Sequence, residues 1–260
     1  MTTDGSMTAQ RPGGAIARAL TLLYGVATYL FFFGTFLYLI GFVGNWVVPK
    51  GIDDGTPAAT TGAAVAVDVL LLGLFAVQHT IMARPAFKEV WTRWVPWHVE
   101  RSTFVLLSTA LLAVMAWQWR PLPEPVWRIE SPLMVALLAG LSLAGWGIVL
   151  VSTFLIDHFE LFGLRQVYAR LTGRPIPEPE FRTPLFYRHV RHPLYTGFVL
   201  SFWATPVMTA GHLLFSIAMT AYILVGIWFE ERDLIAQFGD RYRQYRDQVG
   251  MLLPSRKMPR

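Results

Sequence analysis

A short polar segment at residues 191–197, with the sequence Arg-His-Pro-Leu-Tyr-Thr-Gly, directly precedes the last long apolar run of the chain. Pro193 disfavours helical backbone at His192, and Gly197 allows a ligand or another backbone to approach closely. An arginine, a histidine and a tyrosine presented together suit a ligand with an anionic carboxylate and a flat ring. The segment therefore predicts a small-molecule site made by Arg191, His192, Tyr195 and Gly197.

Two neighbouring carboxylates, Glu230 and Glu231, stand where this apolar run ends. A carboxylate at that position accepts hydrogen bonds from an amino group or from ribose hydroxyls, or balances the charge of a sulfonium. Adjacent helix positions diverge by about 100°, so the two side chains cannot face a ligand equally. Farther on, Tyr242 and Tyr245 are three residues apart and share one helix face. These residues extend the predicted site beyond the apolar run.

Other ionisable side chains stand at the ends of earlier apolar runs. His79 lies near the end of the second run, and Asp157 and His158 follow the fourth. Polar groups at membrane depth are costly and face the protein interior, so His79 is either a site residue or a partner in helix packing. Span ends are normally polar and face headgroups, which is the alternative for Asp157 and His158. With Glu160 and Arg165, they are all expected at one end of a helix bundle.

The composition is that of a membrane protein. Hydrophobic residues make up 54% of the chain and charged residues 15%, whereas about a quarter of the residues in soluble domains are charged. A transmembrane helix needs about 20 apolar residues. Four such spans are predicted, at residues 16–43, 63–82, 102–119 and 133–156.

The last apolar run, residues 196–229, is too long for one crossing. At about 1.5 Å per residue, a single helix over this run would reach about 51 Å. Pro206 and the segment 209–211 offer a break near its middle. We therefore predict an all-α fold, a polytopic transmembrane bundle of four spans plus a C-terminal helical hairpin whose two ends share one side.

The distribution of positive charge predicts the orientation in the membrane. With the N-terminus in the cytoplasm, only three of the 22 Lys and Arg residues fall on the other side, namely Lys50, Arg120 and Arg128. Such asymmetry is typical of inner-membrane proteins, whose cytoplasmic loops carry the excess of positive charge. Both termini and the small-molecule site are then cytoplasmic. The excess of positive charge on the cytoplasmic side of the lipid bilayer explains the net basic charge, so no nucleic-acid partner is needed. The absence of cysteine excludes disulfides and thiolate metal sites, and no metal is expected.

Three parts are predicted along the chain. Residues 1–156 hold the four spans, and residues 157–195 form a cytoplasmic connection. This connection begins with a helix lying in the membrane interface, at 159–171, because Leu161, Leu164 and Tyr168 fall on one stripe. A proline-rich stretch follows. Residues 188–260 form the C-terminal part, with the hairpin 196–229 and a cytoplasmic tail.

Residues 188–253, approximately, resemble the core of the isoprenylcysteine carboxyl methyltransferase and phospholipid methyltransferase superfamily. The resemblance lies in three spaced elements: Arg-His-Pro-x-Tyr-x-Gly, a hairpin, and Glu-Glu-x-x-Leu-x-x-x-Phe-Gly-x-x-Tyr-x-x-Tyr. This resemblance implies that S-adenosylmethionine binds at the cytoplasmic face. Tyr242 would then contact the adenine or anchor the chain at the interface. The residues implied to bind the cofactor are Arg191, His192, Tyr195, Gly197, Glu230, Glu231 and Tyr242.

The segments 78–85 and 152–166 extend the match to most of the chain, and resemble bacterial methanethiol S-methyltransferases. The implied reaction is methylation of methanethiol to dimethyl sulfide. A free alkyl thiol is at least as weakly acidic as cysteine, whose pKa is about 8.5, so a general base or a positive environment is expected. We therefore predict catalytic roles for His79, Asp157 and His158, and substrate contacts for Gln78, Glu160 and Arg165.

Two other functions remain open from the sequence. The same core serves prenylcysteine carboxylates and lipid amines, whose long chains need a groove open to lipid. A non-catalytic protein is the other alternative, in which His79 could even be a haem ligand. A haem site has no need for the paired Arg-His-Pro and Glu-Glu elements, which favours the methyltransferase. The sequence does not specify an oligomeric state.

Overall fold

The computed structural model describes residues 14–56, 58–177 and 180–254. Its elements in chain order are α1 (Ala15–Gly44), α2 (Thr61–Ala83), α3 (Pro85–Trp91), α4 (Trp97–Gln118), β1 (Pro125–Arg128), α5 (Pro132–Ile156), α6 (His158–Leu161), α7 (Leu164–Thr172), the 3₁₀ helix η1 (Leu185–Arg188), α8 (Pro193–Trp203), β2 (Val207–Thr209), α9 (Ala210–Phe238) and α10 (Asp240–Gln248). The parts of the predicted segments that fall on residues 1–13, 178–179 and 255–260 lie outside the described residues.

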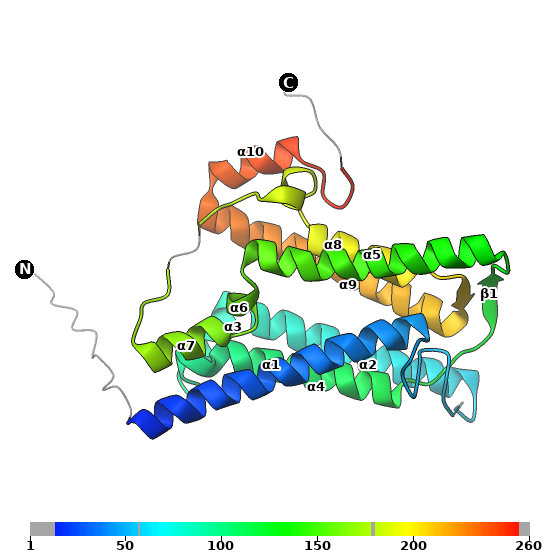
Figure 1. The fold of residues 1–260 in the computed structure, drawn as a ribbon, viewed down its shortest axis with the longest axis horizontal. Helices are drawn as coiled ribbons and strands as arrows, with labels where there is room; N and C mark the ends of the chain where they lie inside the picture. Colours follow the sequence, from blue (N-terminus) through cyan, green and yellow to red (C-terminus); the bar gives the residue numbers. More distant parts are fainter. Residues whose placement is uncertain (1–13, 57, 178–179, 255–260) are drawn as a thin grey trace, which may run out of the picture.

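Five helices, α1, α2, α4, α5 and α9, are long and apolar enough to cross a membrane. They run along the long axis of the molecule (Figure 1). Large apolar side chains are exposed on them, for example Leu30 on α1, Leu70 on α2 and Leu137 on α5. Extended apolar surface of this kind is suited to lipid rather than water. The protein is a multi-pass membrane protein, and the predicted all-α polytopic bundle is confirmed.

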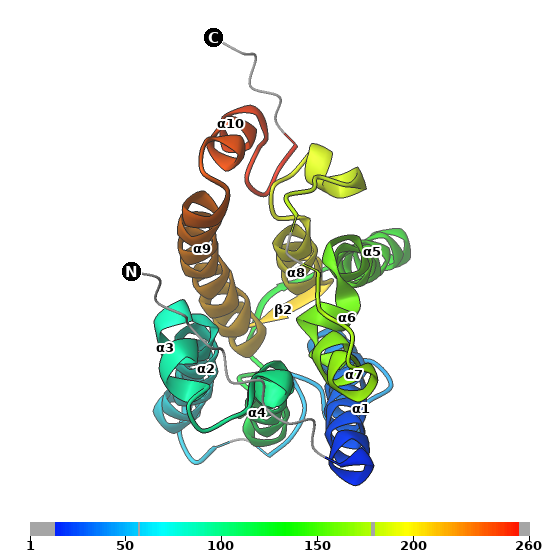
Figure 2. The same cartoon turned by 90° about the vertical axis from the view of Figure 1, so that its left-hand side faces the viewer.

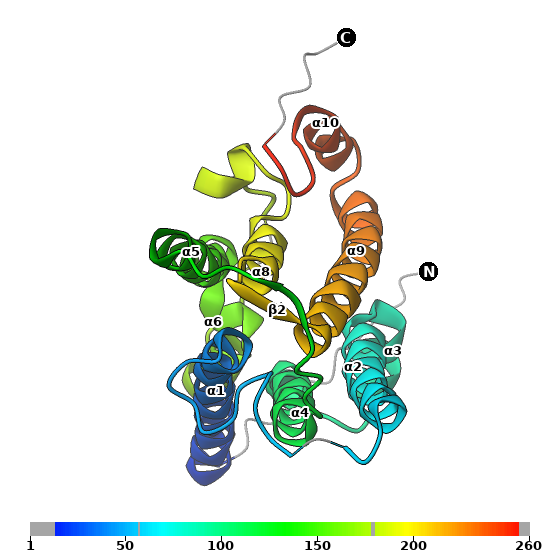
Figure 3. The ribbon, with the colours of Figure 1, turned by 90° about the vertical axis from the view of Figure 1, so that its right-hand side faces the viewer.

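The helices form two layers. Helices α1, α2 and α4 make one layer, and α5, α8 and α9 make the other (Figures 2 and 3). Aromatic side chains join the layers: Phe36 of α1 lies edge-on to Trp146 of α5, with ring centroids 5.6 Å apart. Trp119, at the end of α4, meets Phe215 of α9 in the same way at 5.9 Å. Aromatic packing thus holds the layers together.

Helix α4 begins at Trp97, earlier than the predicted span at residues 102–119. Glu100 lies in its first turn, where a negative charge interacts favourably with the helix dipole. The added turn is polar, so a search for apolar runs misses it. As a consequence, Arg101 belongs to a helix of the bundle and not to a loop.

The C-terminal hairpin has unequal arms. Helix α8 has 11 residues and α9 has 29, which correspond to about 16 Å and 44 Å. Between them, β2 pairs antiparallel with β1 from the α4–α5 connection, a small sheet that the sequence did not predict. The main-chain N–H of Ala210 also donates to Glu124 O at 2.8 Å. Helix α8 is much shorter than the bilayer core of about 30 Å.

The predicted interfacial helix is two helices, α6 and α7, separated at Gly163. This residue has φ +83°, and a Cβ there would lie 2.5 Å from Ser102 Oγ of α4. Only glycine fits both constraints. On α7 the fully buried residue is Val167, which lies against Gly25 of α1, whereas Tyr168 is exposed. Helix α7 therefore packs on α1 and α4 and covers one end of the bundle.

Candidate active site

A cavity of about 560 Å³ lies between the two layers. Helices α1, α2, α4, α5, α8 and α9 all contribute to its lining, which is mostly aromatic and aliphatic. The charged and histidine side chains of the lining come from the end of the bundle at which α2, α5 and α9 terminate. They are His79, Arg84, Arg101, His158, His192, Glu230 and Asp233. The cavity thus combines a long apolar region with one polar end.

The segment before α8 is fixed by the C-terminal strap at residues 249–252. His192 is the N-cap of α8 with non-helical backbone, and Pro193 is the first helical residue. The main-chain N–H groups of Arg191 and His192 donate to Gly250 O at 2.8 Å and to Met251 O at 3.1 Å. These bonds hold the His192 side chain, which is 4% exposed, at the wall of the cavity.

The two neighbouring glutamates have different surroundings. Glu231 Oε1 accepts from Arg191 Nε at 2.8 Å and lies 3.1 Å from His192 Nε2. Glu230 lines the cavity beside Tyr195, and its Oε2 is 3.8 Å from His192 Nδ1. Among the described residues, Glu230 forms no ion pair with a lysine or arginine. Glu231 therefore braces the segment, while Glu230 presents a carboxylate to the cavity.

Tyr242 lies behind this site and not in it. It is 2% exposed, packs against Phe181 and Tyr245, and does not line the cavity. Burial raises the pKa values of Tyr187, Tyr242 and Tyr245, the last to about 12. The Tyr245 hydroxyl donates to Tyr187 O. These neutral tyrosines attach α10 to the segment that leads into α8.

Gly197 serves the contact between α8 and α5. A Cβ at Gly197 would lie 2.6 Å from Gly145 O, and one at Gly145 would lie 2.7 Å from Gly197 O. One turn away, Ser142 Oγ donates to Ser201 O and Ser201 Oγ donates to Ser142 O, each at 3.1 Å. Small residues that allow close backbone approach are typical of membrane helix pairs. Gly197 thus sets the position of α8 and does not line the cavity.

On the other layer, His79 belongs to a hydrogen-bonded chain. Ser108 Oγ donates to Gln78 Oε1 at 3.2 Å and lies 3.1 Å from His79 Nδ1. Because the hydroxyl proton is used for Gln78, Nδ1 of His79 carries the proton in this bond. Nε2 of the neutral ring is then an acceptor, and among the described residues it has no hydrogen-bond partner. His79 lines the cavity, whereas Gln78 lies outside the lining and acts on His79 through Ser108.

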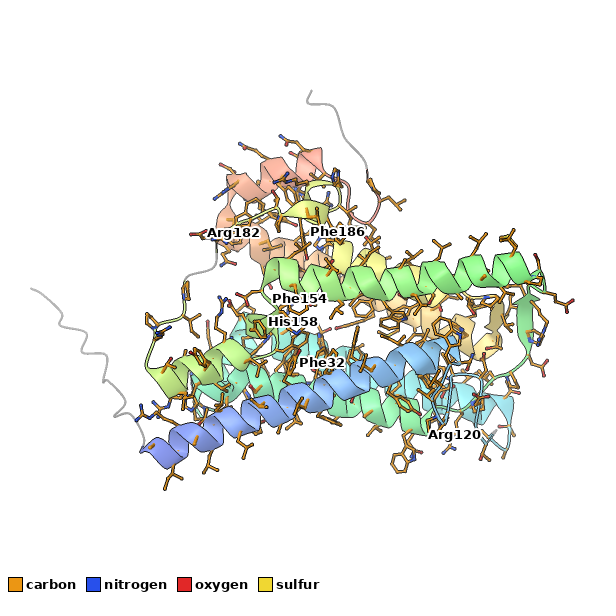
Figure 4. The ribbon with its side chains drawn as sticks, in the orientation of Figure 1. Phe32, Arg120, Phe154, His158, Arg182 and Phe186 are labelled. Carbon is orange, nitrogen blue, oxygen red and sulfur yellow. The ribbon has the colours of Figure 1, made fainter. Side chains whose placement is uncertain are left out.

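His158 also lines the cavity, but both its nitrogens have partners. Nδ1 is 2.8 Å from Thr153 Oγ1, and Nε2 is 2.9 Å from Tyr29 Oη. The ring stacks on Phe154 with centroids 4.1 Å apart, and Figure 4 shows both side chains between α5 and Phe32 of α1. Burial lowers the pKa of His158, although Asp157 acts in the opposite direction. This arrangement favours a neutral histidine that joins α5 to α1.

The other predicted polar residues at this end bind one another. Asp157 caps α6 by accepting from Glu160 N at 3.0 Å, and it forms an ion pair with Arg165. Arg165 also lies 3.3 Å from Glu160 Oε2. The structure places all three outside the lining of the cavity.

Several known proteins that are about half identical to this chain share one name. Methanethiol S-methyltransferase of Mycobacterium tuberculosis is 55% identical over 237 residues, which are 91% of this chain and 97% of the relative. Methanethiol S-methyltransferase 1 of Bradyrhizobium diazoefficiens is 54% identical over 245 residues, or 94% of this chain and 86% of that one. The chain belongs to the methanethiol S-methyltransferase family.

This family membership confirms the resemblance seen in the sequence and makes the protein an integral membrane methyltransferase. A more distant relative, Nurim of Mus musculus, is 28% identical over 243 residues, which cover 84% of this chain and 91% of Nurim. No family model matches the chain. No solved structure matches it either.

Within this methanethiol S-methyltransferase family member, the cavity brings together five of the residues predicted from sequence. These are His79, His158, His192, Tyr195 and Glu230. The remaining predicted residues, Gln78, Asp157, Glu160, Arg165, Arg191, Gly197, Glu231 and Tyr242, lie outside its lining. Gln78, Arg191 and Glu231 are the partners of lining residues, so they act on the cavity indirectly.

The polar residues of the lining that were not predicted as site residues include Arg101, Tyr187 and Asp233. Arg101 was assigned to a loop, Tyr187 precedes the recognised motif, and Asp233 follows the glutamate pair. Asp233 accepts from Arg84 Nη1 at 2.9 Å and so joins α9 to α2. For Arg101 a signal did exist, because a charge beside an apolar run is expensive in a membrane and marks function.

Proposed function

We propose that this protein transfers the methyl group of S-adenosylmethionine to methanethiol, giving dimethyl sulfide and S-adenosylhomocysteine. The names of relatives about half identical over most of the chain support this acceptor. The observation that carries the proposal is the mostly apolar cavity with Glu230 on one layer and His79 on the other. An apolar cavity suits a small apolar thiol and its product.

The α8–α9 side of the cavity fits a sulfonium cofactor. Glu230 offers a carboxylate without a lysine or arginine partner among the described residues, which balances positive charge. Tyr195 and His192 stand beside it as polar contacts. The volume of about 560 Å³ falls in the range of small-molecule and cofactor sites. When bound, S-adenosylmethionine supplies the methyl group from its sulfonium, and a thiolate is the form of the acceptor that attacks it.

The α2–α4 side is proposed to act on the acceptor. Since an alkyl thiol is at least as weakly acidic as cysteine, whose pKa is about 8.5, little thiolate exists at neutral pH. His79 Nε2 is an available acceptor for the thiol proton, and Ser108 and Gln78 fix its tautomer. A positioned general base contributes about 10²–10⁴-fold to a rate.

The orientation is proposed from the charges at the two ends of the molecule. Arg182 and Arg120 lie toward opposite ends of the long axis (Figure 4). At the end that carries Arg120, Lys50 donates to Trp119 O at 2.8 Å and Asp68 accepts from Arg120 N at 2.8 Å, so these charges have internal partners. We place this end outside and the polar end of the cavity in the cytoplasm of an inner membrane. Residues 188–260 are then the methyltransferase core.

Headspace gas chromatography tests the proposal on purified protein in detergent, supplied with S-adenosylmethionine and methanethiol. Dimethyl sulfide formed in equal amount with S-adenosylhomocysteine is the expected result. If calorimetry shows cofactor binding but no product forms, methanethiol is not the acceptor. Larger thiols, prenylcysteines and lipid amines would then be tested in its place.

A further inference from the structure

The guanidinium of Arg101, on α4, lines the cavity and forms no ion pair among the described residues. Its Nε donates to Leu161 O at 2.7 Å, and the guanidinium lies over the Phe104 ring at 5.0 Å. Within the part of the chain that the structure describes, its two terminal nitrogens have no hydrogen-bond partner. Donors that point into a cavity without a partner are available to a ligand.

The surrounding charges leave this cation uncompensated. Glu100 and Glu160 are near enough to act on it through their charges, but among the described residues neither forms an ion pair with it. Glu160 is bound instead by Arg165 at 3.3 Å. On the other side, Lys88 of α3 adds a second positive charge.

The charged groups of α2 do not neutralise Arg101 either. Arg84 is paired with Asp233 at 2.9 Å. His79, which is close enough to sense the charge of Arg101, is itself a base. A guanidinium away from bulk water without an anion costs several kcal/mol. The missing partner is therefore an anion that enters with a ligand.

Two anions could fill this position, the carboxylate of the cofactor and a thiolate. The position of Arg101 favours the thiolate. Arg101 and His79 both lie against Phe104, since the guanidinium is 5.0 Å and the His79 ring centroid 4.8 Å from the centroid of its ring. The residues suited to the cofactor, by contrast, lie on α8 and α9.

We propose that Arg101 is a catalytic residue that binds the sulfur of the acceptor as a thiolate. This inference rests on the proposed function and adds the cation that stabilises the negative charge of the acceptor. The thiol S–H bond breaks, its proton passes to His79 Nε2, and the electron pair stays on sulfur beside the guanidinium. Glu230 and Arg101 then match the opposite charges of the two reactants from opposite layers.

Infrared difference spectroscopy tests this directly, because the chain contains no cysteine and so gives no S–H band of its own. Methanethiol is bound at neutral pH to the full-length protein that holds unreactive S-adenosylhomocysteine. The S–H stretching band should be lost in the wild type and in Arg101→Lys, and should persist in Arg101→Met. Arg182→Met, which changes an exposed arginine, is the control and should behave as the wild type.

Turnover and cofactor affinity separate this role from others. Arg101→Met should lower kcat/KM for methanethiol about 100-fold, as expected for loss of one stabilising charge. Its affinity for S-adenosylmethionine should stay within about two-fold, whereas a group that holds the cofactor carboxylate would lose more. If Arg101→Met does not fold, Arg101→Lys carries the test. In that variant the S–H band should still be lost and activity should be partly retained.

The outcomes also separate this proposal from the proposed function. A wild-type S–H band that persists at normal turnover overturns the thiolate site and leaves the function intact. A lost band without dimethyl sulfide overturns the function and leaves the thiolate site. Weaker cofactor binding in Arg101→Met, with the band still lost, assigns the guanidinium to the cofactor and overturns the proposal.

Discussion

The two sides of the cavity are built in different ways. On the α8–α9 side, His192 and Glu230 come from one motif and stand in front of a charged brace between Arg191 and Glu231. On the α2–α4 side, His79 and Arg101 come from separate spans, and their partners are a hydroxyl and a main-chain carbonyl.

The difference relates to what each side has to do. A brace of paired charges fixes side chains before a ligand arrives, which suits the recognition of a large cofactor. Reactive groups need a free lone pair or a free charge, so they are oriented by neutral partners and are left open toward the cavity. We therefore propose that the braced side binds the cofactor and that the open side carries out the chemistry.

The largest effect is expected from Glu230→Gln. The amide keeps the size of the side chain but removes the charge proposed to balance the sulfonium. Affinity for S-adenosylmethionine should fall about 100-fold, the range for a bond to a charged group, as measured by isothermal calorimetry. Glu89→Gln, an exposed residue of α3, serves as the control. Unchanged affinity in Glu230→Gln would remove this residue from the cofactor site.

His79→Ala should separate chemistry from binding. We expect kcat to fall about 100-fold, in the range for a general base, while cofactor affinity changes less than about two-fold. Part of the loss should be recovered as the pH rises above about 8.5 toward the pKa of the alkyl thiol, because more thiolate then forms without a base. The exposed His189 provides His189→Ala as the control. Equal losses of binding and turnover in His79→Ala would contradict the division between the two sides.

Gly197→Ala tests whether the braced side depends on the α5–α8 contact. The added methyl would lie 2.6 Å from Gly145 O, so the helices must move apart, at a cost of about 1–3 kcal/mol. The melting temperature and the cofactor affinity should both fall. Gly147→Ala on α5 is the matched control, because nothing lies within 4 Å of a Cβ there. If both variants melt alike, the close contact is not what positions α8.

The smallest effect is expected at His158, the histidine whose two nitrogens are bonded. His158→Gln should retain kcat within about three-fold, because no free nitrogen is lost to the cavity. Burial lowers the pKa of His158 in the folded state, so its contribution to stability is present above the unfolded pKa of about 6.5 and is lost as pH falls. Thermal melts from pH 7.5 downward should decline less steeply in the variant. A large loss of kcat would instead make His158 the base.

Much of the fold was predictable because it depends on local features. Apolar runs gave α1, α2 and α5 within two residues of their observed ends. The hairpin was predictable from length and from Pro206. The early start of α4 was not, since its first turn is polar, and neither was the β1–β2 pairing, which joins distant segments.

Within the site, the motif residues His192, Tyr195 and Glu230 could be assigned to one place because they flank one hairpin. Gly197 was predicted to face a ligand, but the structure uses it against Gly145, which no local pattern indicates. Asp157 and Arg165 were predicted in the site, and the structure pairs them with each other. A sequence shows where a polar group within a membrane span carries an energetic cost, but not which partner group offsets that cost.

The sequence by itself determined that this chain spans a membrane, that it carries a methyltransferase motif and that the motif lies at the end of the bundle rich in positive charge. Hydropathy, the positions of the charged residues and the spacing of the motif are properties of the linear order of residues, so they can be read along the chain. Tertiary structure alone decided which ionisable groups are paired and which are free. Pairing depends on the distances between helices that are remote in sequence. As a result, Glu230, His79 and Arg101 face the cavity, where a ligand can contact them.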